Sequence, residues 1–256
     1  MKRKIIVGNW KMNPPTLDEA QAIFKKVKRT AANLTSTYVV VCPPLVYIPK
    51  FSPLRLKRLL KTSVGLGAQN VFFESQGAYT GEVSAPMLKE FGVTHVIIGH
   101  SERRAAGETD EIVSKKVLAV LDAGIHPIVC VGEAERDIHA LYLDTLRNQI
   151  RNSLSRVPKK LVSQLIVAYE PLWAIGAKDA MDPAVIEETV IFVRKVLADA
   201  FGQENTLNTL VLYGGATNFR NAPDIVSRGK VDGLLVGRES VNTPGFVELL
   251  KAVDAL

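Results

Sequence analysis

Eight short apolar segments recur along the chain, separated by longer amphipathic stretches. Each apolar segment is rich in β-branched residues and nearly continuous, rather than alternating between apolar and polar positions. This pattern is typical of parallel strands that are buried on both faces of a sheet. The predicted strands lie within residues 4–10, 37–44, 62–70, 93–100, 125–133, 164–171, 208–215 and 230–237.

Amphipathic helices are predicted between these strands. Thr16 and Glu19 have the spacing of a capping box, and Asp182 followed by Pro183 has the signature of a helix start. Thr243-Pro244 repeats this start signal, and similar starts are expected near residues 84 and 109. The apolar stripes that follow are Ala20, Ile23, Phe24, Val27 and Ala31; Ile186, Val190, Val193 and Leu197; and Phe246, Leu249, Leu250 and Val253.

Strands that alternate with helices predict an α/β fold with a parallel sheet. Eight strands in 256 residues fit a closed (β/α)8 barrel. An open doubly wound sheet is the alternative, but GNWKMN at 8–13 follows the first strand, where a dinucleotide-binding GxGxxG motif would stand. No Gly/Ser-rich linker divides the chain, so we predict one barrel domain over residues 1–256.

Composition narrows the class of protein. Apolar residues make up 47% of the chain, which is ample for a large core. The net charge of +6 and the pI of about 9.3 leave nucleic-acid binding open, but the Lys and Arg residues are scattered, which favours a solvated basic surface. Cys42 and Cys130 lie in apolar segments and show no disulfide or metal-ligand spacing. With no signal-peptide core and no membrane-length apolar run, an intracellular setting is expected.

Polar residues and glycines cluster where the predicted strands end. In a barrel these ends meet on one face, which is the face that carries the chemistry. The residues are Asn9, Lys11, Gln69, Asn70, His100, Ser101, Glu102, Glu170, Gly214, Gly215 and Gly237.

Taken singly, these residues also have structural interpretations. Glu170 follows the apolar run LIVAY, where an ionised carboxylate is costly unless a cation pairs with it or it is kept there to react. His100 fits a hydrogen-bonded core histidine, and Lys11 fits a simple partner of Glu102. Three further residues are interpreted as structural or packing residues: Cys130, Glu133 and Trp173.

Taken together, the residues indicate catalysis. A carboxylate, an imidazole, an ammonium and an amide around one cavity suit proton abstraction beside a carbonyl group. The glycine turns at 214–215 and 237 follow the seventh and eighth strands, where such barrels commonly hold a phosphate. Glycine lets backbone N–H groups approach an anion closely. The predicted substrate is a small phosphorylated carbonyl compound.

Motifs along the whole chain resemble the triosephosphate isomerase family. The resemblance implies a cofactor-free enzyme that interconverts dihydroxyacetone phosphate and glyceraldehyde 3-phosphate in glycolysis and gluconeogenesis, in the cytoplasm. It implies no metal, nucleic-acid or membrane partner. The motifs are NWKMN at 9–13, GAQN at 67–70, GAYTGE at 77–82, IIGHSERR at 97–104, GET at 107–109, VCVGE at 129–133, AYEPLWAIG at 168–176, YGG at 213–215 and DGLLVG at 232–237.

The resemblance assigns a role to each catalytic residue. Glu170 would take a proton from the carbon beside the carbonyl and return it to the neighbouring carbon. Neutral His100 would polarise the carbonyl, and Lys11 would supply positive charge for the phosphate and the developing oxyanion. Asn9 would hold the oxygens, and Glu102 would order Lys11 and His100.

The resemblance also implies a lid, a phosphate site and a homodimer. Lid closure would exclude water from the reaction. Thr80 would reach the partner's active site, close to its Asn9 and Lys11. The lid would comprise Pro171, Leu172, Trp173, Ala174, Ile175, Gly176, Ala177, Lys178, Asp179, Ala180 and Met181, with its hinge at Pro171 and Trp173 and a latch from Tyr213; the phosphate would meet Gly176, Ala216, Gly237 and Arg238.

The sequence departs from the family pattern in four places. Lys178 and Asp179 replace the usual glycine and lysine of the lid. Ala216 replaces a serine, and Arg238 replaces a glycine, although both still offer a backbone N–H to phosphate. The loop after Arg104 is one residue shorter than the family pattern, for which the sequence offers no physical reason.

Two alternatives are considered. The altered lid leaves room for an isomerase of a four-carbon sugar phosphate with the same base. A non-catalytic phosphate-binding barrel is the other, which the loss of a catalytic residue would favour. The intact Lys11, His100 and Glu170 favour the triose phosphate enzyme over both.

Overall fold

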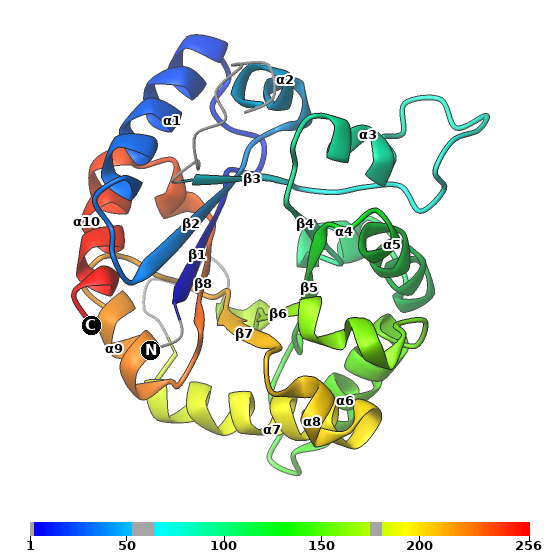
Figure 1. Ribbon diagram of the computed structural model, residues 1–256. Helices are drawn as coiled ribbons and strands as arrows, with labels where there is room; N and C mark the ends of the chain where they lie inside the picture. Colours follow the sequence, from blue (N-terminus) through cyan, green and yellow to red (C-terminus); the bar gives the residue numbers. More distant parts are fainter. Residues whose placement is uncertain (1–2, 53–63, 175–180) are drawn as a thin grey trace.

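The computed structural model describes residues 3–52, 64–174 and 181–256. Within them, eight parallel strands pair in chain order and close into a barrel, because β8 also pairs with β1 (Figure 1). The predicted (β/α)8 fold is therefore confirmed. The strands are β1 (Lys4–Asn9), β2 (Thr37–Cys42), β3 (Val64–Ala68), β4 (His95–Ile98), β5 (His126–Val131), β6 (Ile166–Tyr169), β7 (Leu210–Tyr213) and β8 (Gly233–Val236).

Helices surround the barrel on its outside (Figure 1). Among the described residues, no helix has the length and apolar character needed to cross a membrane. The α-helices are α1 (Leu17–Ala31), α2 (Ile48–Phe51), α3 (Ala85–Glu90), α4 (Ser101–Ala105), α5 (Asp110–Asp122), α6 (Leu141–Ser153), α7 (Pro183–Phe201), α8 (Gln203–Thr206), α9 (Ala222–Arg228) and α10 (Thr243–Asp254). Short 3₁₀ helices are η1 (Leu45–Tyr47), η3 (Lys159–Gln164), η4 (Leu172–Ala174) and η5 (Arg238–Ser240).

The predicted helix starts are confirmed, although one cap residue differs. The Thr16 side chain accepts a hydrogen bond from the Glu19 N–H at 3.3 Å, and Asp182 caps α7 through the Ala184 N–H at 2.9 Å. Ser84 and Thr109 cap α3 and α5 in the same way. At α10 the helix starts at the predicted Thr243-Pro244 signal, but the cap residue is Asn242 and not Thr243, which is already helical. The Asn242 amide donates to the Glu239 carboxylate at 3.2 Å and makes no capping bond.

The strands carry apolar side chains on both faces, which explains their continuous apolar sequences. One set of side chains fills the barrel interior, and the other packs against the helices. Cys42 and Cys130 belong to the interior set and are free thiols, as predicted. The predicted helix stripes face the core, with Phe24 only partly buried. The interior set consists of Ile5, Val7, Val40, Cys42, Ile97, Ile128, Cys130, Ile166, Ala168, Leu212 and Leu235.

The strands are shorter than the apolar segments that predicted them. Asn9 is the last residue of β1, Ser101 and Glu102 open α4, and the other polar residues and glycines singled out above stand in the loops at the carboxyl ends of the strands. One of these loops, residues 71–84 between β3 and α3, extends well away from the barrel (Figure 1). Most of its side chains are exposed.

Candidate active site

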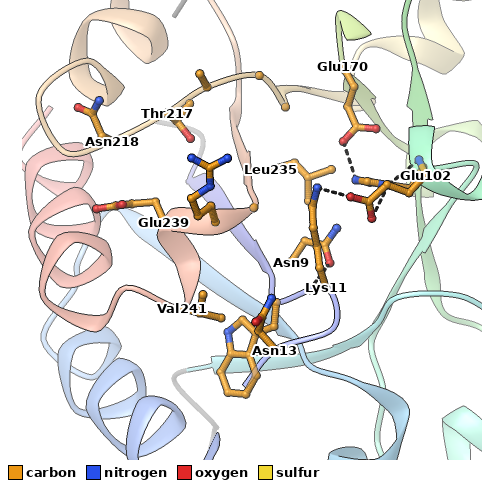
Figure 2. Close-up of a pocket in the computed structure, with 17 residues that line it drawn as sticks. Asn9, Lys11, Asn13, Glu102, Glu170, Thr217, Asn218, Leu235, Glu239 and Val241 are labelled. Carbon is orange, nitrogen blue, oxygen red and sulfur yellow. Dashed lines mark hydrogen bonds and ion pairs between the residues drawn. The ribbon is translucent and has the colours of Figure 1, made fainter. Parts of the chain in front are cut away.

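A pocket of about 620 Å³ opens at the carboxyl ends of the strands (Figure 2). A cavity of this size suits a small-molecule ligand. It brings together the predicted catalytic residues, which come from the carboxyl ends of three strands, β1, β4 and β6. The pocket is lined by Asn9, Trp10, Lys11, Asn13, His100, Glu102, Glu170, Gly214, Gly215, Ala216, Thr217, Asn218, Leu235, Gly237, Arg238, Glu239 and Val241.

Glu170 stands directly after β6 and is only 3% exposed. Its Oε1 lies 3.3 Å from Nε2 of His100. Within the described part of the chain, its other oxygen, Oε2, is buried without a hydrogen-bond partner. Burial raises the pKa of the carboxyl group above its ordinary value, against the opposing effects of His100 and Lys11. A carboxylate in this setting accepts a proton more readily than one in water.

Two neighbours fix the position of Glu170. A Cβ atom on Gly214 would lie 2.6 Å from the Cγ of Glu170, so only glycine leaves room for the carboxylate there. The Cys130 thiol contacts the same carboxyl group from the barrel interior. Burial, together with that carboxylate, raises the pKa of the thiol well above its ordinary value, so Cys130 remains protonated.

His100 is held in one tautomer by the backbone. It is the N-cap residue of α4, and its Nδ1 accepts a hydrogen bond from the Glu102 N–H at 3.2 Å. Since a backbone N–H can only donate, Nδ1 carries a lone pair and the proton sits on Nε2. The Glu102 carboxylate is 3.7 Å from Nδ1, too far for a hydrogen bond that would reverse this assignment. The imidazole is therefore neutral and presents its Nε2–H to the pocket and to Glu170.

Lys11 occupies a strained backbone position with a φ of 53°. Its N–H donates to the Asn9 side chain at 3.1 Å, and its carbonyl accepts from the Gln69 amide at 2.8 Å. The ammonium group reaches Oε1 of Glu102 at 2.7 Å (Figure 2). Burial raises the pKa of Glu102, but the hydrogen bond and charge of Lys11, with the effect of His100, bring it below its ordinary value. The ion pair aims the Lys11 side chain across the pocket.

The loops after β7 and β8 form the opposite wall of the pocket. Gly214, Gly215 and Ala216 follow β7, and Gly237 and Arg238 follow β8. A Cβ on Gly215 would lie 2.2 Å from the Tyr213 hydroxyl, so the chain can turn there only with glycine. This wall combines small residues with free space, which suits a bulky anion.

Sequence reasoning missed several residues of the same wall. Thr217 and Asn218 follow Ala216, just beyond the YGG motif, and line the pocket, as does Glu239 next to Arg238 (Figure 2). Their position after a strand end was the available signal. Trp10 and Asn13, which belong to the NWKMN motif, also line the pocket, as do Leu235 and Val241, which carry no polar signal.

Both described ends of the predicted lid are tied down. Trp173 donates through Nε1 to Glu133 at 3.2 Å, and the Leu172 N–H donates to the Glu133 carbonyl at 2.9 Å. At the other end the Met181 N–H donates to the Tyr213 hydroxyl at 3.4 Å, the latch that was predicted. Ile175, Gly176, Ala177, Lys178, Asp179 and Ala180 lie outside the described residues.

Glu133 has a specific place in this arrangement. Its carboxylate is 1% exposed and accepts from the Tyr169 hydroxyl at 2.7 Å and from the Arg136 guanidinium at 2.9 Å. The Trp173 contact adds a third donor to the same oxygen. Glu133, interpreted above as structural, is therefore a buried carboxylate that accepts three hydrogen bonds and connects β6 to the start of the lid.

Among the predicted strand-end residues and the predicted dimer contact, four lie outside the pocket lining: Gln69, Asn70, Ser101 and Thr80. Asn70 accepts from the Lys116 ammonium at 2.8 Å, and Lys116 also pairs with buried Glu108. Thr80 lies in the extended loop 71–84 and is exposed. In the described ranges, no three His, Cys, Asp or Glu side chains are grouped so that they could hold a metal ion.

The barrel and its pocket define a class of enzyme. A buried carboxylate that faces a neutral imidazole, with an ammonium beside them and a glycine-rich wall, defines an isomerase that moves protons on a small phosphorylated carbonyl compound. Comparison with known proteins names the family.

The family model for triosephosphate isomerase matches residues 4–253. A triosephosphate isomerase of Dehalococcoides mccartyi is 40% identical over 98% of this chain and 97% of its own length. Those of Endomicrobium trichonymphae and Herpetosiphon aurantiacus are each 37% identical over 98% of this chain and 99% of their own. The chain belongs to the triosephosphate isomerase family. It is an aldose–ketose isomerase that interconverts dihydroxyacetone phosphate and glyceraldehyde 3-phosphate, a step of glycolysis.

Proposed function

We propose that Glu170, His100, Lys11, Asn9 and Glu102 carry out this isomerisation. The observation that carries the proposal is the contact of 3.3 Å between the Glu170 carboxylate and the Nε2–H of His100 in a buried site. A general base must lie within reach of the proton that it takes, and its pKa must be shifted toward the working pH. The raised pKa of Glu170 meets the second condition.

The proposed reaction moves protons and leaves the oxidation level of the molecule unchanged. Glu170 takes a proton from the carbon beside the carbonyl, and the electron pair of that bond forms the enediolate double bond. The Nε2–H of His100 gives its proton to the former carbonyl oxygen, and the ring takes back the proton of the neighbouring hydroxyl group, which becomes the new carbonyl oxygen. Lys11 stabilises the negative charge on these oxygens. Glu170, now protonated, returns the proton to the neighbouring carbon.

The supporting residues hold these groups in place. The Asn9 side chain accepts from the Lys11 N–H and fixes its strained backbone. Glu102 supplies its carboxylate to Lys11 and its N–H to His100, so one residue positions both. Because all donors are oriented before substrate binds, little reorganisation is required in the transition state.

The phosphate is proposed to bind to the backbone N–H groups of Ala216, Gly237, Arg238 and Gly176. The first three line the wall opposite Glu170. Ala216 offers no hydroxyl group, so a hydrogen bond that serine would give to phosphate and lid is missing. We expect the lid, residues 171–181, to close less firmly by about 1 kcal/mol, which is up to tenfold in closed-state population.

We further propose a homodimer in the cytoplasm. Thr80 lies in the projecting loop 71–84, next to Tyr79, whose side chain is 44% exposed. Met12, next to Lys11, is 93% exposed. Large apolar side chains left in water at both proposed contact points favour an interface there. A loop inserted from the partner would then cover the pocket side of Lys11.

Steady-state kinetics on two substrates tests the proposal. The chain should isomerise glyceraldehyde 3-phosphate with a far higher kcat/KM than a tetrulose phosphate, and Glu170→Gln should abolish both activities. Faster turnover of the tetrulose phosphate would mean that the altered lid marks a longer substrate. Retained activity in Glu170→Gln would mean that another group is the base.

A further inference from the structure

A second cavity, of about 680 Å³, lies at the amino ends of the strands, opposite the catalytic pocket. Tyr38, His95 and His126 line it from β2, β4 and β5, at positions whose alternation along each strand leads to the interior residues of the barrel. Arg3, just before β1, and Lys89, in α3, contribute its charges. We call this space the amino-end cavity.

The charged side chains described in the lining of the amino-end cavity are all positive. Arg3 and Lys89 line it, and its lining as described contains no Asp or Glu. Neither cation forms an ion pair with a carboxylate within residues 3–52, 64–174 and 181–256; Lys89 donates only to the Gly124 carbonyl at 2.6 Å. Two uncompensated cations at one concave site attract an anion, because low-dielectric walls focus their field.

His95 makes its hydrogen-bond contact with Thr94 inside the amino-end cavity and is buried there. The Thr94 hydroxyl lies 3.1 Å from the Leu66 carbonyl and 2.8 Å from the Nδ1 of His95. When the hydroxyl group donates to the carbonyl, the ring donates to the hydroxyl oxygen through its Nδ1–H. Burial, reinforced by the charge of His126, lowers the pKa of His95 to about 3, so the ring is neutral. In the tautomer with the proton on Nδ1, the remaining nitrogen, Nε2, carries a lone pair.

The ring of His126 also makes a hydrogen-bond contact through Nδ1. Its Nδ1 lies 3.2 Å from the Gln164 carbonyl, which can only accept, so the proton is on Nδ1. The ring centroids of His95 and His126 are 5.3 Å apart. The cavity thus offers two cations for an anionic group and, in the neutral state of both rings, two imidazole nitrogens that accept hydrogen bonds from hydroxyl groups.

We propose that the amino-end cavity is a binding site for a small phosphate ester that carries hydroxyl groups. Arg3 and Lys89 bind the phosphate, and the Nε2 atoms of His95 and His126 accept from the hydroxyl groups. A volume of 680 Å³ holds a molecule of metabolite size and not a folded partner. The site is separated from Glu170 by the interior layers of the barrel, so it is independent of the proposed catalytic roles.

NMR of protein with ¹⁵N-labelled histidine tests this site directly. The chain has four histidines, of which His95 and His126 report the amino-end cavity, His100 reports the catalytic pocket and His139 is outside both. Glycerol 3-phosphate, inorganic phosphate and sodium chloride are titrated separately at matched ionic strength. We expect saturable shifts of His95 and His126, with glycerol 3-phosphate binding tighter than phosphate.

Variants show whether the two cations hold the ligand. Arg3→Gln with Lys89→Gln should weaken the response of His95 and His126 about tenfold or more, and leave the His100 response and kcat/KM unchanged. Lys50→Gln with Arg151→Gln removes the same charge from exposed positions outside the cavity and should change neither response. The proposal is overturned if His95 and His126 shift no more than in chloride, or if both double variants behave alike. Equal affinity for phosphate and glycerol 3-phosphate would overturn the role of the imidazoles.

Discussion

Glu170 and His100 face each other at 3.3 Å, although the carboxylate enters from the end of β6 and the imidazole from the start of α4. The backbone N–H of Glu102 places the imidazole proton on Nε2, the atom that faces the carboxylate. A base and a neutral proton donor are thereby held side by side before any substrate arrives.

The first prediction concerns stability and pH. Burial raises the pKa of Glu170 above the ordinary carboxyl value of 4.5, so the folded protein holds its proton more tightly than the unfolded chain. Stability is therefore lost as the pH rises from about 4.5 through the raised pKa. Glu170→Gln removes this loss, so the variant should unfold at a higher temperature than the wild type at pH 8.

Thermal unfolding at pH 4 and pH 8 checks the sign. The advantage of Glu170→Gln should shrink toward pH 4, where the wild-type carboxyl group is protonated in both states. Equal melting temperatures at pH 8, or an advantage that grows toward pH 4, would show that the buried carboxylate does not carry this cost.

The second prediction concerns Gly214. In Gly214→Ala the new Cβ would lie 2.6 Å from the Cγ of Glu170, so the carboxylate must move away from His100. Misplacing a catalytic group by about 1 Å can cost on the order of a hundredfold in rate. We expect kcat to fall by about this factor while circular dichroism shows a folded barrel. A folded variant with wild-type kcat would contradict the proposed position of the base.

The third prediction concerns the missing hydroxyl group at position 216. Ala216→Ser should restore one hydrogen bond to phosphate and lid, and tighten phosphate binding by up to about tenfold. Inhibition by inorganic phosphate and the kinetic constants measure this. If the variant leaves both the catalytic constants and the phosphate affinity unchanged, the hypothesis of weaker lid closure is wrong.

The fourth prediction concerns the dimer. Thr80→Arg places a charged side chain at the tip of the loop that is proposed to insert into a partner, and burying an unpaired charge in an interface is strongly unfavourable. Analytical ultracentrifugation should show a dimer for the wild type and monomers for the variant, with activity lost in parallel. Glu74→Arg, in the same exposed loop, tests whether any added charge has this effect. A monomeric wild type would contradict the proposal.

The barrel could be predicted from sequence because each strand carries apolar residues on both faces. The caps at Thr16 and Asp182 could also be predicted, because each capping bond joins residues no more than three positions apart in the sequence. The cap of α10 was misplaced by one residue because Asn242 and Thr243 are both residue types that favour the cap position, and the cap residue makes no side-chain capping bond.

The site was only partly predictable. Lys11, His100 and Glu170 are polar residues at strand ends, so their position in the sequence was enough to predict them as site residues. The role of Glu133 as an acceptor of three hydrogen bonds depends on Tyr169, Arg136 and Trp173, which meet only in the folded chain. The amino-end cavity was missed because His95 and His126 stand within apolar segments more than 30 residues apart, and nothing in the sequence brings them together.

The central claim is that Glu170 moves the proton between the two carbons. The most direct measurement is deuterium incorporation from D₂O into dihydroxyacetone phosphate and glyceraldehyde 3-phosphate, followed by ¹H NMR, for wild type and Glu170→Gln. We predict exchange and isomerisation in the wild type, and a loss of both by at least about a thousandfold in Glu170→Gln, with phosphate binding retained. Exchange that survives in Glu170→Gln would contradict the account.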